Sequence, residues 1–257
     1  MRIVPVPVLL DNYAYLVIAD SGAAAVVDPS EAKPVLAAAE REQADLKAIW
    51  NTHHHWDHVG GNRDLLLAKP DLAVYGYAGD RARIPGITKP VDDGEQFDFA
   101  GTPVSVIFIP AHTSGHIAYH LPSERSVFTG DTLFAGGCGR LFEGDAGMMV
   151  ASLSRLTSLP ADTKIFCGHE YTEKNLRFAL TLEPGNAELA AKHRKVKDLS
   201  DRGEPTVPTT VGDELATNPF LRSNSRELRE AIRKRFPECP DDPITVFART
   251  RELKDAF

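Results

Sequence analysis

The feature that most constrains this chain is a cluster of histidine and aspartate residues in the stretch Thr-His-His-His-Trp-Asp-His at 52–58. The possible metal ligands in it are His53, His55, Asp57 and His58. The cluster follows the apolar run Ala48-Ile49-Trp50, so we expect it where a strand gives way to a loop. Imidazole and carboxylate groups suit zinc, iron or manganese. The cluster therefore predicts a metal site at the end of a strand.

Three later segments each place a further donor just past a short apolar run. They are His112 after 104–109, Asp131 after 126–128, and His169 after 164–167. An isolated histidine in such a position is more often a packed or surface residue. In this order and behind the 52–58 cluster, however, the three donors supply what a dinuclear metal site still lacks.

Up to about residue 170, short apolar runs alternate with turn residues and helix-like stretches. The expected strands are Tyr13–Ile18, Ala24–Val27, Ala48–Trp50, Val104–Ile109, Ser126–Phe128 and Lys164–Cys167. The expected helices are Ala32–Glu42, Asn62–Lys69 and Met148–Ser158. Strands interleaved with helices favour a layered architecture of sheets and helices.

After residue 171 the composition becomes that of helices, rich in Ala, Leu, Glu, Lys and Arg. We expect helices over Asn175–Leu180, Ala187–Ser200, Ser225–Phe236 and Pro243–Lys254, with a loop at Arg202–Gly212. The last helix opens with Asp242-Pro243, a capping residue followed by proline at the first helical position. The chain is thus predicted to form a catalytic domain at 1–170 and a mostly helical substrate-binding domain at 171–257.

Charge and cysteine usage limit the partners and the compartment. The formal net charge is −7, which gives no electrostatic attraction to nucleic acid or to an anionic membrane. No apolar run approaches the roughly 18 residues of a membrane span, and the first residues do not resemble a secretory signal. Three widely spaced cysteines fit reduced thiols rather than a disulfide framework. We expect a cytoplasmic monomer that binds neither nucleic acid nor membranes.

The motifs around these donors resemble those of a known family. The segments at 52–62, 112–116 and 128–134 read THHHWDHVGGN, HTSGH and FTGDTLF, and in looser form they occur throughout the metallo-β-lactamase-fold hydrolases. The segments at 137–144, 167–172 and 218–222 read GCGRLFEG, CGHEYT and NPFLR. These are specific to the hydroxyacylglutathione hydrolases, also called glyoxalase II. The chain resembles this family over nearly its whole length.

The resemblance implies a fold of two β-sheets flanked by helices, αββα, with a small C-terminal helical domain. It implies one metal ion on His53, His55 and His112, and a second on Asp57, His58 and His169, with Asp131 bridging the two. The expected cofactors are two divalent cations, zinc first, with iron or manganese as alternatives. His54 falls between ligands and is expected to be structural. Of His116, His120 and His193, none is expected to bind metal, and His116 is the one expected to orient the site.

The tail offers basic residues for an anionic substrate. In a helix over Pro243–Lys254, Arg251 and Lys254 are three apart and share a face. The resemblance implies that they bind the glycine end of glutathione. Spacing alone favours a solvated face with Arg251 paired to Asp255. The resemblance also implies substrate contacts from Arg140, Phe142 and Tyr171. Many relatives have lysine and tyrosine where this chain has Arg140 and Phe142, so the guanidinium keeps the charge and the phenyl ring lacks the hydroxyl.

The reaction that the resemblance implies is hydrolysis of the thioester S-(R)-lactoylglutathione to glutathione and D-lactate, by hydroxide held between two cations. Asp57 and Asp131 are the expected catalytic residues, and no Gly-x-Ser-x-Gly nucleophile motif is found. One alternative is an iron-dependent glutathione persulfide dioxygenase on the same fold. Others are a β-lactam or lactone hydrolase and a non-catalytic metal-binding protein.

Overall fold

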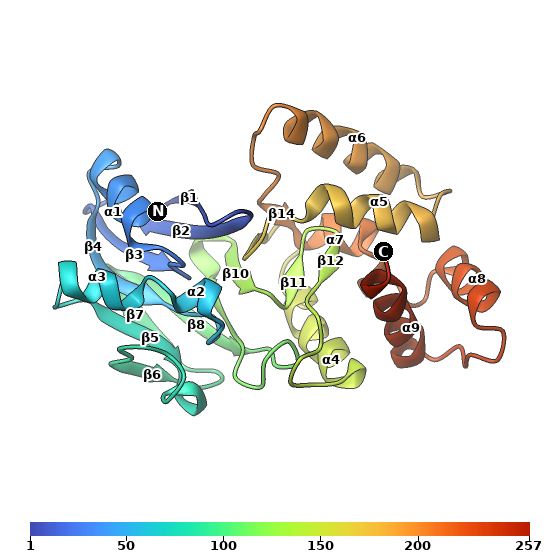
Figure 1. Ribbon diagram of the computed structural model, residues 1–257, viewed down its shortest axis with the longest axis horizontal. Helices are drawn as coiled ribbons and strands as arrows, with labels where there is room; N and C mark the ends of the chain where they lie inside the picture. Colours follow the sequence, from blue (N-terminus) through green and yellow to red (C-terminus); the bar gives the residue numbers. More distant parts are fainter.

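Two six-stranded sheets pack face to face, with helices on both outer faces and a group of helices at one end, as Figure 1 shows. The computed structural model describes the whole chain, Met1–Phe257. The predicted αββα layering is therefore present. Every helix is too short or too polar to cross a lipid bilayer.

The first sheet has the order β1-β2-β3-β4-β5-β6 and is antiparallel at β1 to β3 and parallel from β3 to β6. Its strands are β1 (Arg2–Val8), β2 (Asn12–Ile18), β3 (Ala23–Val27), β4 (Asp45–Trp50), β5 (Ala73–Tyr77) and β6 (Lys89–Val91). All residues of β2 are buried, because successive side chains alternate between the two faces of a sheet that is covered on both sides. Tyr13, Tyr15 and Val17 face the second sheet, whereas Ala14, Leu16 and Ile18 face the helices.

The second sheet has the order β14-β13-β10-β9-β8-β7, with β10 and β13 parallel and the other pairs antiparallel. Its strands are β7 (Gln96–Phe99), β8 (Thr102–Phe108), β9 (Ile117–Leu121), β10 (Ser126–Gly130), β13 (Lys164–Cys167) and β14 (Thr209–Thr210). A small hairpin of β11 (Leu133–Phe134) and β12 (Gly137–Cys138) follows β10. The core between the two sheets is aromatic, with Trp50, Tyr119 and Phe128 fully buried in it.

Three helices of the first 170 residues cover the sheets. A very short helix and two 3-10 turns lie in the connecting loops. The covering helices are α1 (Ala32–Arg41), α3 (Asn62–Ala68) and α4 (Ala146–Thr157). The short elements are α2 (Trp56–Val59) and the 3-10 turns η1 (Ala78–Asp80) and η2 (Pro122–Glu124). The apolar faces of α1 and α3 pack on the first sheet, and that of α4 packs on the second. Asp145 caps α4 by accepting from Met148 N.

The tail is helical as predicted and lies on the right in Figure 1. It comprises α5 (Thr172–Leu182), α6 (Ala187–Asp201), α7 (Val211–Thr217), the 3-10 turn η3 (Pro219–Leu221), α8 (Arg226–Arg235) and α9 (Pro243–Asp255). Asp242 caps α9 by accepting from Thr245 N, with Pro243 in the first turn. Phe178, Phe220 and Phe247 share one core with α4 and the outer face of the second sheet. The tail is therefore packed against α4 and the second sheet.

The six strands and three helices expected before residue 170 all exist, with ends shifted by a few residues at most. The expected loop at Arg202–Gly212 is wrong at its end, because Thr209 and Thr210 pair with β13 and Val211 begins α7. The strands that were not expected are β1, β5, β6, β7, β9, β11, β12 and β14, of which β1 contains Pro5 and Pro7. Proline is tolerated there because β1 is an edge strand.

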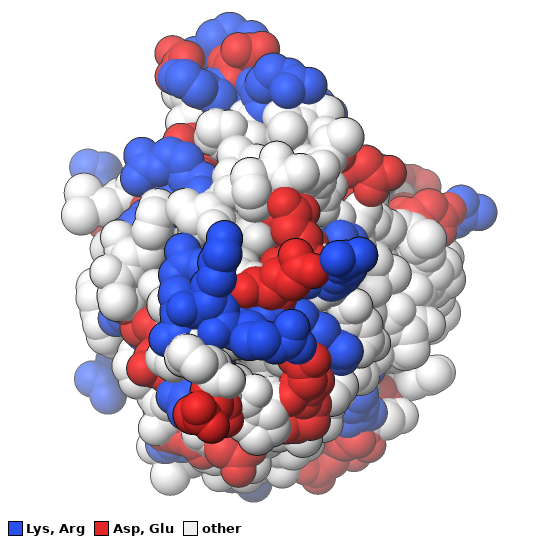
Figure 2. Space-filling model, turned by 90° about the vertical axis from the view of Figure 1, so that its right-hand side faces the viewer, with Lys and Arg blue, Asp and Glu red and all other residues white.

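The exposed face of the tail carries many charges of both signs. Figure 2 looks at this end of the molecule and shows Lys and Arg side chains gathered beside Asp and Glu. The ion pairs on α8, on α9 and between these helices are Arg226–Glu230, Arg233–Asp241 and Arg249–Glu252. Three of the arginines on this surface are thus paired with neighbouring acids.

Candidate metal centre

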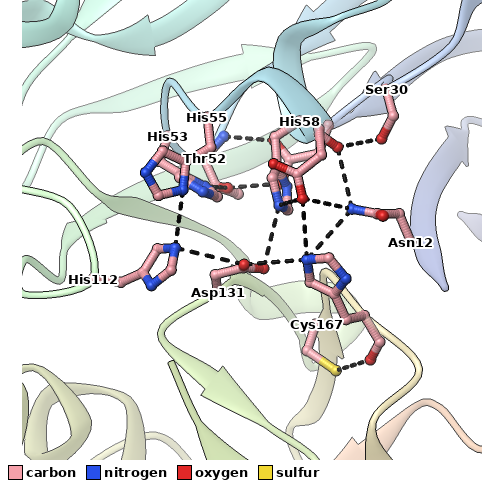
Figure 3. Close-up of polar contacts among 12 residues, drawn as sticks. Asn12, Ser30, Thr52, His53, His55, His58, His112, Asp131 and Cys167 are labelled. Atoms are coloured by element: carbon pink, nitrogen blue, oxygen red, sulfur yellow. Dashed lines mark hydrogen bonds and ion pairs between the residues drawn. The ribbon is translucent and has the colours of Figure 1, made fainter. Parts of the chain in front are cut away.

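The seven side chains expected to bind metal come together in two groups around Asp131. Donor atoms of His53, His55 and His112 lie within 4.8 Å of one another, and so do those of Asp57, His58 and His169. Asp131 Oδ2 lies 3.6 Å from His112 Nε2 and 3.2 Å from His169 Nε2. Its Oδ1 lies 3.3 Å from His58 Nε2. The carboxylate therefore stands between the groups, as Figure 3 shows for the labelled residues.

The first four ligands come from the segment that follows β4. Strand β4 ends at Trp50, and α2 begins at Trp56 with His55 as its N-cap. His53 and His55 therefore lie in the loop, whereas Asp57 and His58 lie in the first turn of α2. One abrupt change from strand to helix thus places four ligands on one side of the site.

The remaining ligands lie after strands of the second sheet. His112 follows β8, Asp131 directly follows β10, and His169 lies two residues beyond β13. The parallel pairing of β10 with β13 carries Asp131 and His169 to the same edge. Glycine is required at 168, because a Cβ there would lie 2.4 Å from Asp131 Oδ1 and 2.6 Å from His58 Cε1. The backbone at residue 168 can come this close to Asp131 and His58 only because glycine has no side chain.

Several of these nitrogen and oxygen atoms make no hydrogen bond within the protein. His53 Nε2, His58 Nε2 and Asp131 Oδ1 are buried and make no hydrogen bond. Burying an unpaired polar atom is costly, so unpaired atoms of this kind point to an absent ligand. Divalent cations coordinated by these nitrogen and oxygen atoms would satisfy all three. The donor set therefore fits a dinuclear metal site.

Other residues orient the ligands through their second ring nitrogens. Asp28 Oδ2 lies 3.0 Å from His58 Nδ1, and Asp11 Oδ1 lies 2.9 Å from His169 Nδ1. The carbonyl oxygen of Arg140 lies 2.9 Å from His112 Nδ1. Such contacts fix the tautomer and leave Nε2 free for metal. Asp28 also accepts from Thr52 N and Oγ1, so it serves as an orienting residue although it lies close enough to His53 and His58 for a ligand.

The charges of the site depend on one another. Burial lowers the pKa of His53 well below its usual value. For Asp131, burial would raise the pKa, but His58 and His169 outweigh it and hold the pKa well below normal. Burial opposes the charge on His169, but Asp131 raises its pKa to about 10. Without metal, protonated imidazoles supply the positive charge that the buried carboxylate requires, and this is the charge that cations would replace.

A cavity of about 690 Å³ opens over the ligands and reaches the tail. At the metal end it is lined by His55, Asp57, His112, Asp131 and His169. All five residues expected to contact substrate line it as well: Arg140, Phe142, Tyr171, Arg251 and Lys254. The cavity thus combines a donor-rich end with a cationic end that is built largely from α5 and α9.

The aromatic residues lie nearest the ligands. The Tyr171 ring stacks on His169 with the centroids 4.7 Å apart and the planes at 7°. The Phe142 ring is 61% exposed and lies 5.2 Å from the His112 ring. Both side chains are therefore placed to touch a molecule bound beside the metals.

The cationic residues fill the other end. Arg251 is 7% exposed, donates from Nη1 to the Cys138 carbonyl oxygen, and pairs with Asp255 at 2.9 Å. The pairing that spacing alone favoured is therefore present, but on a buried arginine at the pocket rather than on a solvated face. Lys254 Nζ lies over the rings of Phe178 and Phe257, 5.2 Å from each centroid.

Two histidines outside the ligand set also contribute. His116 Nε2 accepts from Asp131 N at 3.1 Å, and its ring stacks on His53 at 4.5 Å. His54 Nδ1 lies 3.2 Å from Asp80 Oδ2, pointing to a structural role. His120 and His193 do not line the cavity.

Sequence reasoning missed Asp11, Asp28 and Lys174. Asp28 directly follows β3, so the signal that identified the ligands, a donor just past an apolar strand, was also present for it. Lys174 lines the cavity from the first turn of α5. Nothing in the local sequence distinguishes it from the other lysines of the tail, because its position depends on how α5 docks.

Comparison with known proteins agrees with this arrangement. A family model described as the metallo-beta-lactamase superfamily matches residues 8–169, and one described as the hydroxyacylglutathione hydrolase C-terminus matches residues 170–257. Hydroxyacylglutathione hydrolase from Gloeobacter violaceus is 55% identical over 97% of both chains. That from Synechococcus sp. (strain JA-2-3B'a(2-13)) is 51% identical over 100% of both chains.

Solved structures share the fold. ETHE1 from Myxococcus xanthus matches with a TM-score of 0.65 and 23% identity, over 100% of both chains. TTHA1623 in a di-iron-bound form matches with a TM-score of 0.62 and 30% identity, over 86% of this chain and 100% of that one. The layered fold and the full-length relatives agree with each other, and the chain belongs to the hydroxyacylglutathione hydrolase family of the metallo-β-lactamase superfamily.

Proposed function

We propose that this chain hydrolyses the thioester S-(R)-lactoylglutathione to glutathione and D-lactate, the second step in the removal of methylglyoxal. The observation that carries the proposal is the single cavity that joins the ligands around Asp131 to Arg251 and Lys254 of the tail. A dinuclear site alone fits many hydrolases. The tail, which the C-terminal family model matches over residues 170–257, supplies the cations that a glutathione thioester needs.

The proposed ligands are those of the two groups described above, with His53, His55 and His112 on one cation, Asp57, His58 and His169 on the other, and Asp131 between them. Zinc is the proposed metal, and the same donor chemistry accepts iron or manganese. The di-iron form of the related TTHA1623 supports iron as an alternative. When bound, two such cations lower the pKa of water towards neutrality and polarise a carbonyl group.

Asp57 is the residue proposed to orient the attacking water. Its pKa falls to about 2: burial opposes the shift, but hydrogen bonding with His169 and the nearby His58 outweigh it. Asn12 Nδ2 donates to Asp57 Oδ2 at 3.1 Å and so fixes the direction of the carboxylate. A charged, fixed acceptor can hold a water proton and aim its oxygen lone pair at the thioester carbon.

The leaving group needs little help from the protein. A thiol has a pKa of about 8.5, so the thiolate departs without a strong general acid. Near the proposed ligands, the cavity is also lined by Tyr171 and by Asp11, whose carboxylate is bonded to His169. Burial and nearby carboxylates raise the pKa of Tyr171, so it stays a neutral hydrogen-bond donor.

Glutathione carries two carboxylates, and the cationic end of the cavity matches that charge. Arg251 and Lys254 are proposed to bind the glycine end, and Arg140 and Tyr171 to contact the rest of the molecule beside Phe142. On this proposal residues 1–170 are the catalytic domain and residues 171–257 the substrate-binding domain. The free thiols of Cys138 and Cys167, both buried, support a reducing compartment such as the cytoplasm. The monomeric state stays a prediction.

The test is a comparison of two assays on the purified protein. Release of thiol from lactoylglutathione supports the proposal, and oxygen uptake with glutathione persulfide supports the dioxygenase instead. The full-length relatives named hydroxyacylglutathione hydrolase do not favour the dioxygenase. An absence of thiol release from any acylglutathione would contradict the proposal.

A further inference from the structure

The loop at 140–144 carries two of the proposed substrate contacts. Its Leu141 packs, partly buried, against the core that includes α4, and Arg140 Nε lies 3.5 Å from Asp255 Oδ1. At its start, the Arg140 carbonyl oxygen accepts from Nδ1 of the ligand His112. At its end, Gly144 lies so close to Ala111 that a Cβ on it would come within 2.6 Å of Ala111 Cα. Between these points Phe142 is largely exposed, so burial of its ring does not fix the loop.

Glu143 anchors the half of the loop that follows Phe142. Its Oε2 accepts from the backbone N–H of Ser114 at 2.7 Å and from Ser114 Oγ at 2.7 Å. Its Oε1 accepts from Arg83 Nη1 at 2.8 Å. Burial opposes its charge, yet the bonds from Ser114 and Arg83 lower its pKa to about 2, so it is ionised at any working pH. Charge-assisted bonds of this kind are the stronger ones.

Arg83 is itself held in place by Asp80 and Ser114. Its Nε donates to Asp80 Oδ1 at 3.0 Å, and its Nη2 donates to Ser114 Oγ at 2.9 Å. Asp80 is 2% exposed and its other oxygen lies 3.2 Å from His54 Nδ1. His54 stands between the ligands His53 and His55, so the network extends from the metal loop to the rim of the cavity.

We propose that Glu143, through Ser114 and Arg83, is a positioning residue that holds Phe142 and Arg140 over the metal cavity. It does not touch the reacting atoms. It fixes the loop in the conformation that binds substrate. Substrate binding therefore does not have to order the loop, which would cost free energy. The inference rests on the proposed function, because the two loop side chains are taken to contact the glutathione thioester.

The chain offers a matched control in Asp93. This carboxylate also accepts from a backbone N–H, that of Phe108, and from two guanidinium nitrogens of Arg155. It does not line the cavity. Removal of the Asp93 carboxylate and removal of the Glu143 carboxylate should therefore perturb general stability alike, and only the second should act on substrate binding.

The test compares Glu143→Ala, Glu143→Gln and Asp93→Ala with the unaltered protein. Glu143→Ala should raise KM for lactoylglutathione about 3–10-fold with kcat within about twofold, since binding interactions that are equal in the ground and transition states affect KM alone. Glu143→Gln can still accept a hydrogen bond from Ser114 N but lacks the charge that binds Arg83. Its KM should therefore lie between those of the unaltered protein and Glu143→Ala. Asp93→Ala should leave KM unchanged, and all variants should keep their bound metal.

A protein that lacks the Arg140 and Phe142 side chains separates an effect on their position from an effect on the stability of the whole fold. In the double variant Arg140→Ala/Phe142→Ala, adding Glu143→Ala should leave KM unchanged, because nothing remains on the loop to be positioned. The same rise in KM in both backgrounds, or no rise in either, would overturn the proposal.

Hydrogen exchange keeps the test independent of the reaction. Amide exchange at Ser114, whose N–H donates to Glu143 Oε2, should become faster in Glu143→Ala and not in Asp93→Ala. Unchanged exchange there would overturn the positioning role. If the unaltered protein released no thiol from any acylglutathione while the exchange result held, the proposed function would fail and the anchoring of the loop by Glu143 would stand.

Discussion

Lys254 Nζ lies 3.5 Å from the backbone carbonyl oxygen of Lys174, so α9 and α5 meet at the cationic end of the metal cavity. Burial lowers the pKa of Lys254 to about 8, and Arg251, Lys174 and Arg177 act in the same direction. The ammonium group is therefore charged at neutral pH and neutral above that pKa. Its proton is lost within the range in which activity is measured.

This predicts a pH dependence of substrate binding. As pH rises from 7 to 9, kcat/KM for lactoylglutathione should fall about threefold or more, because the free enzyme loses a charge that attracts a carboxylate. Lys254→Arg should abolish this fall, since a guanidinium stays charged. Steady-state rates of both proteins across this range provide the check. A fall of equal size in Lys254→Arg would assign the dependence to another group.

Arg251 should act mainly on substrate binding. Arg251→Gln should raise KM about tenfold with a smaller change in kcat. A contact far from the reacting carbon stabilises the bound substrate and the transition state alike, so its loss acts mainly on KM. Arg249, two residues away on α9, is partly exposed, is paired with Glu252 and does not line the cavity, so Arg249→Gln is the matched control. Kinetics of the two variants side by side would show the difference. Equal KM values for Arg251→Gln and Arg249→Gln would mean that the guanidinium of Arg251 stabilises the fold and does not bind substrate.

Asp28 should govern metal affinity without binding metal. Its contact with His58 Nδ1 orients that ligand, so Asp28→Asn should weaken metal binding about 10–100-fold. Competition with a chelator of known affinity measures the change. Asp98→Asn, at an exposed turn where the carboxylate accepts from Gly101 N, should bind metal as the unaltered protein does. Unchanged affinity in Asp28→Asn would show that the other contacts suffice to orient His58.

A buried ion pair lies within the tail, between α6 and α7, and its carboxylate also binds the turn of the β11–β12 hairpin. Glu214 is 0% exposed and pairs with Lys192, and its Oε2 accepts from Gly136 N and Asn218 Nδ2. Lys192→Met should lower the free energy of unfolding by about 3 kcal/mol, because it leaves a buried carboxylate without its cation. Denaturant unfolding measures this. Lys197→Met, which removes an exposed pair with Asp201, should be indistinguishable from the unaltered protein.

Much of the fold and of the site could be predicted because the signals are local. Apolar runs that end in a small residue and a donor identified the strands β4, β10 and β13 together with His53, Asp131 and His169. Among the strands that escaped prediction are β1, which contains Pro5 and Pro7, and the two-residue strands β11, β12 and β14. Their strand character comes from pairing with neighbours rather than from their own residues.

The supporting residues of the site depend on tertiary contacts in the same way. Asp28 and His58 are 30 positions apart, and Arg83 and Glu143 are 60 apart. No spacing rule in one sequence connects such pairs. The tail helices were predictable from composition, but the docking that brings Lys174 and Lys254 to one cavity was not.

The central claim, that two cations around Asp131 carry the reaction, is tested most directly by titrating the metal-free protein with Zn²⁺ while the initial rate of lactoylglutathione hydrolysis is recorded. We expect the rate to reach its plateau at two equivalents of metal per chain, and Asp131→Ala to recover almost none of it at any metal concentration. A plateau at one equivalent, or full recovery in Asp131→Ala, would contradict the account.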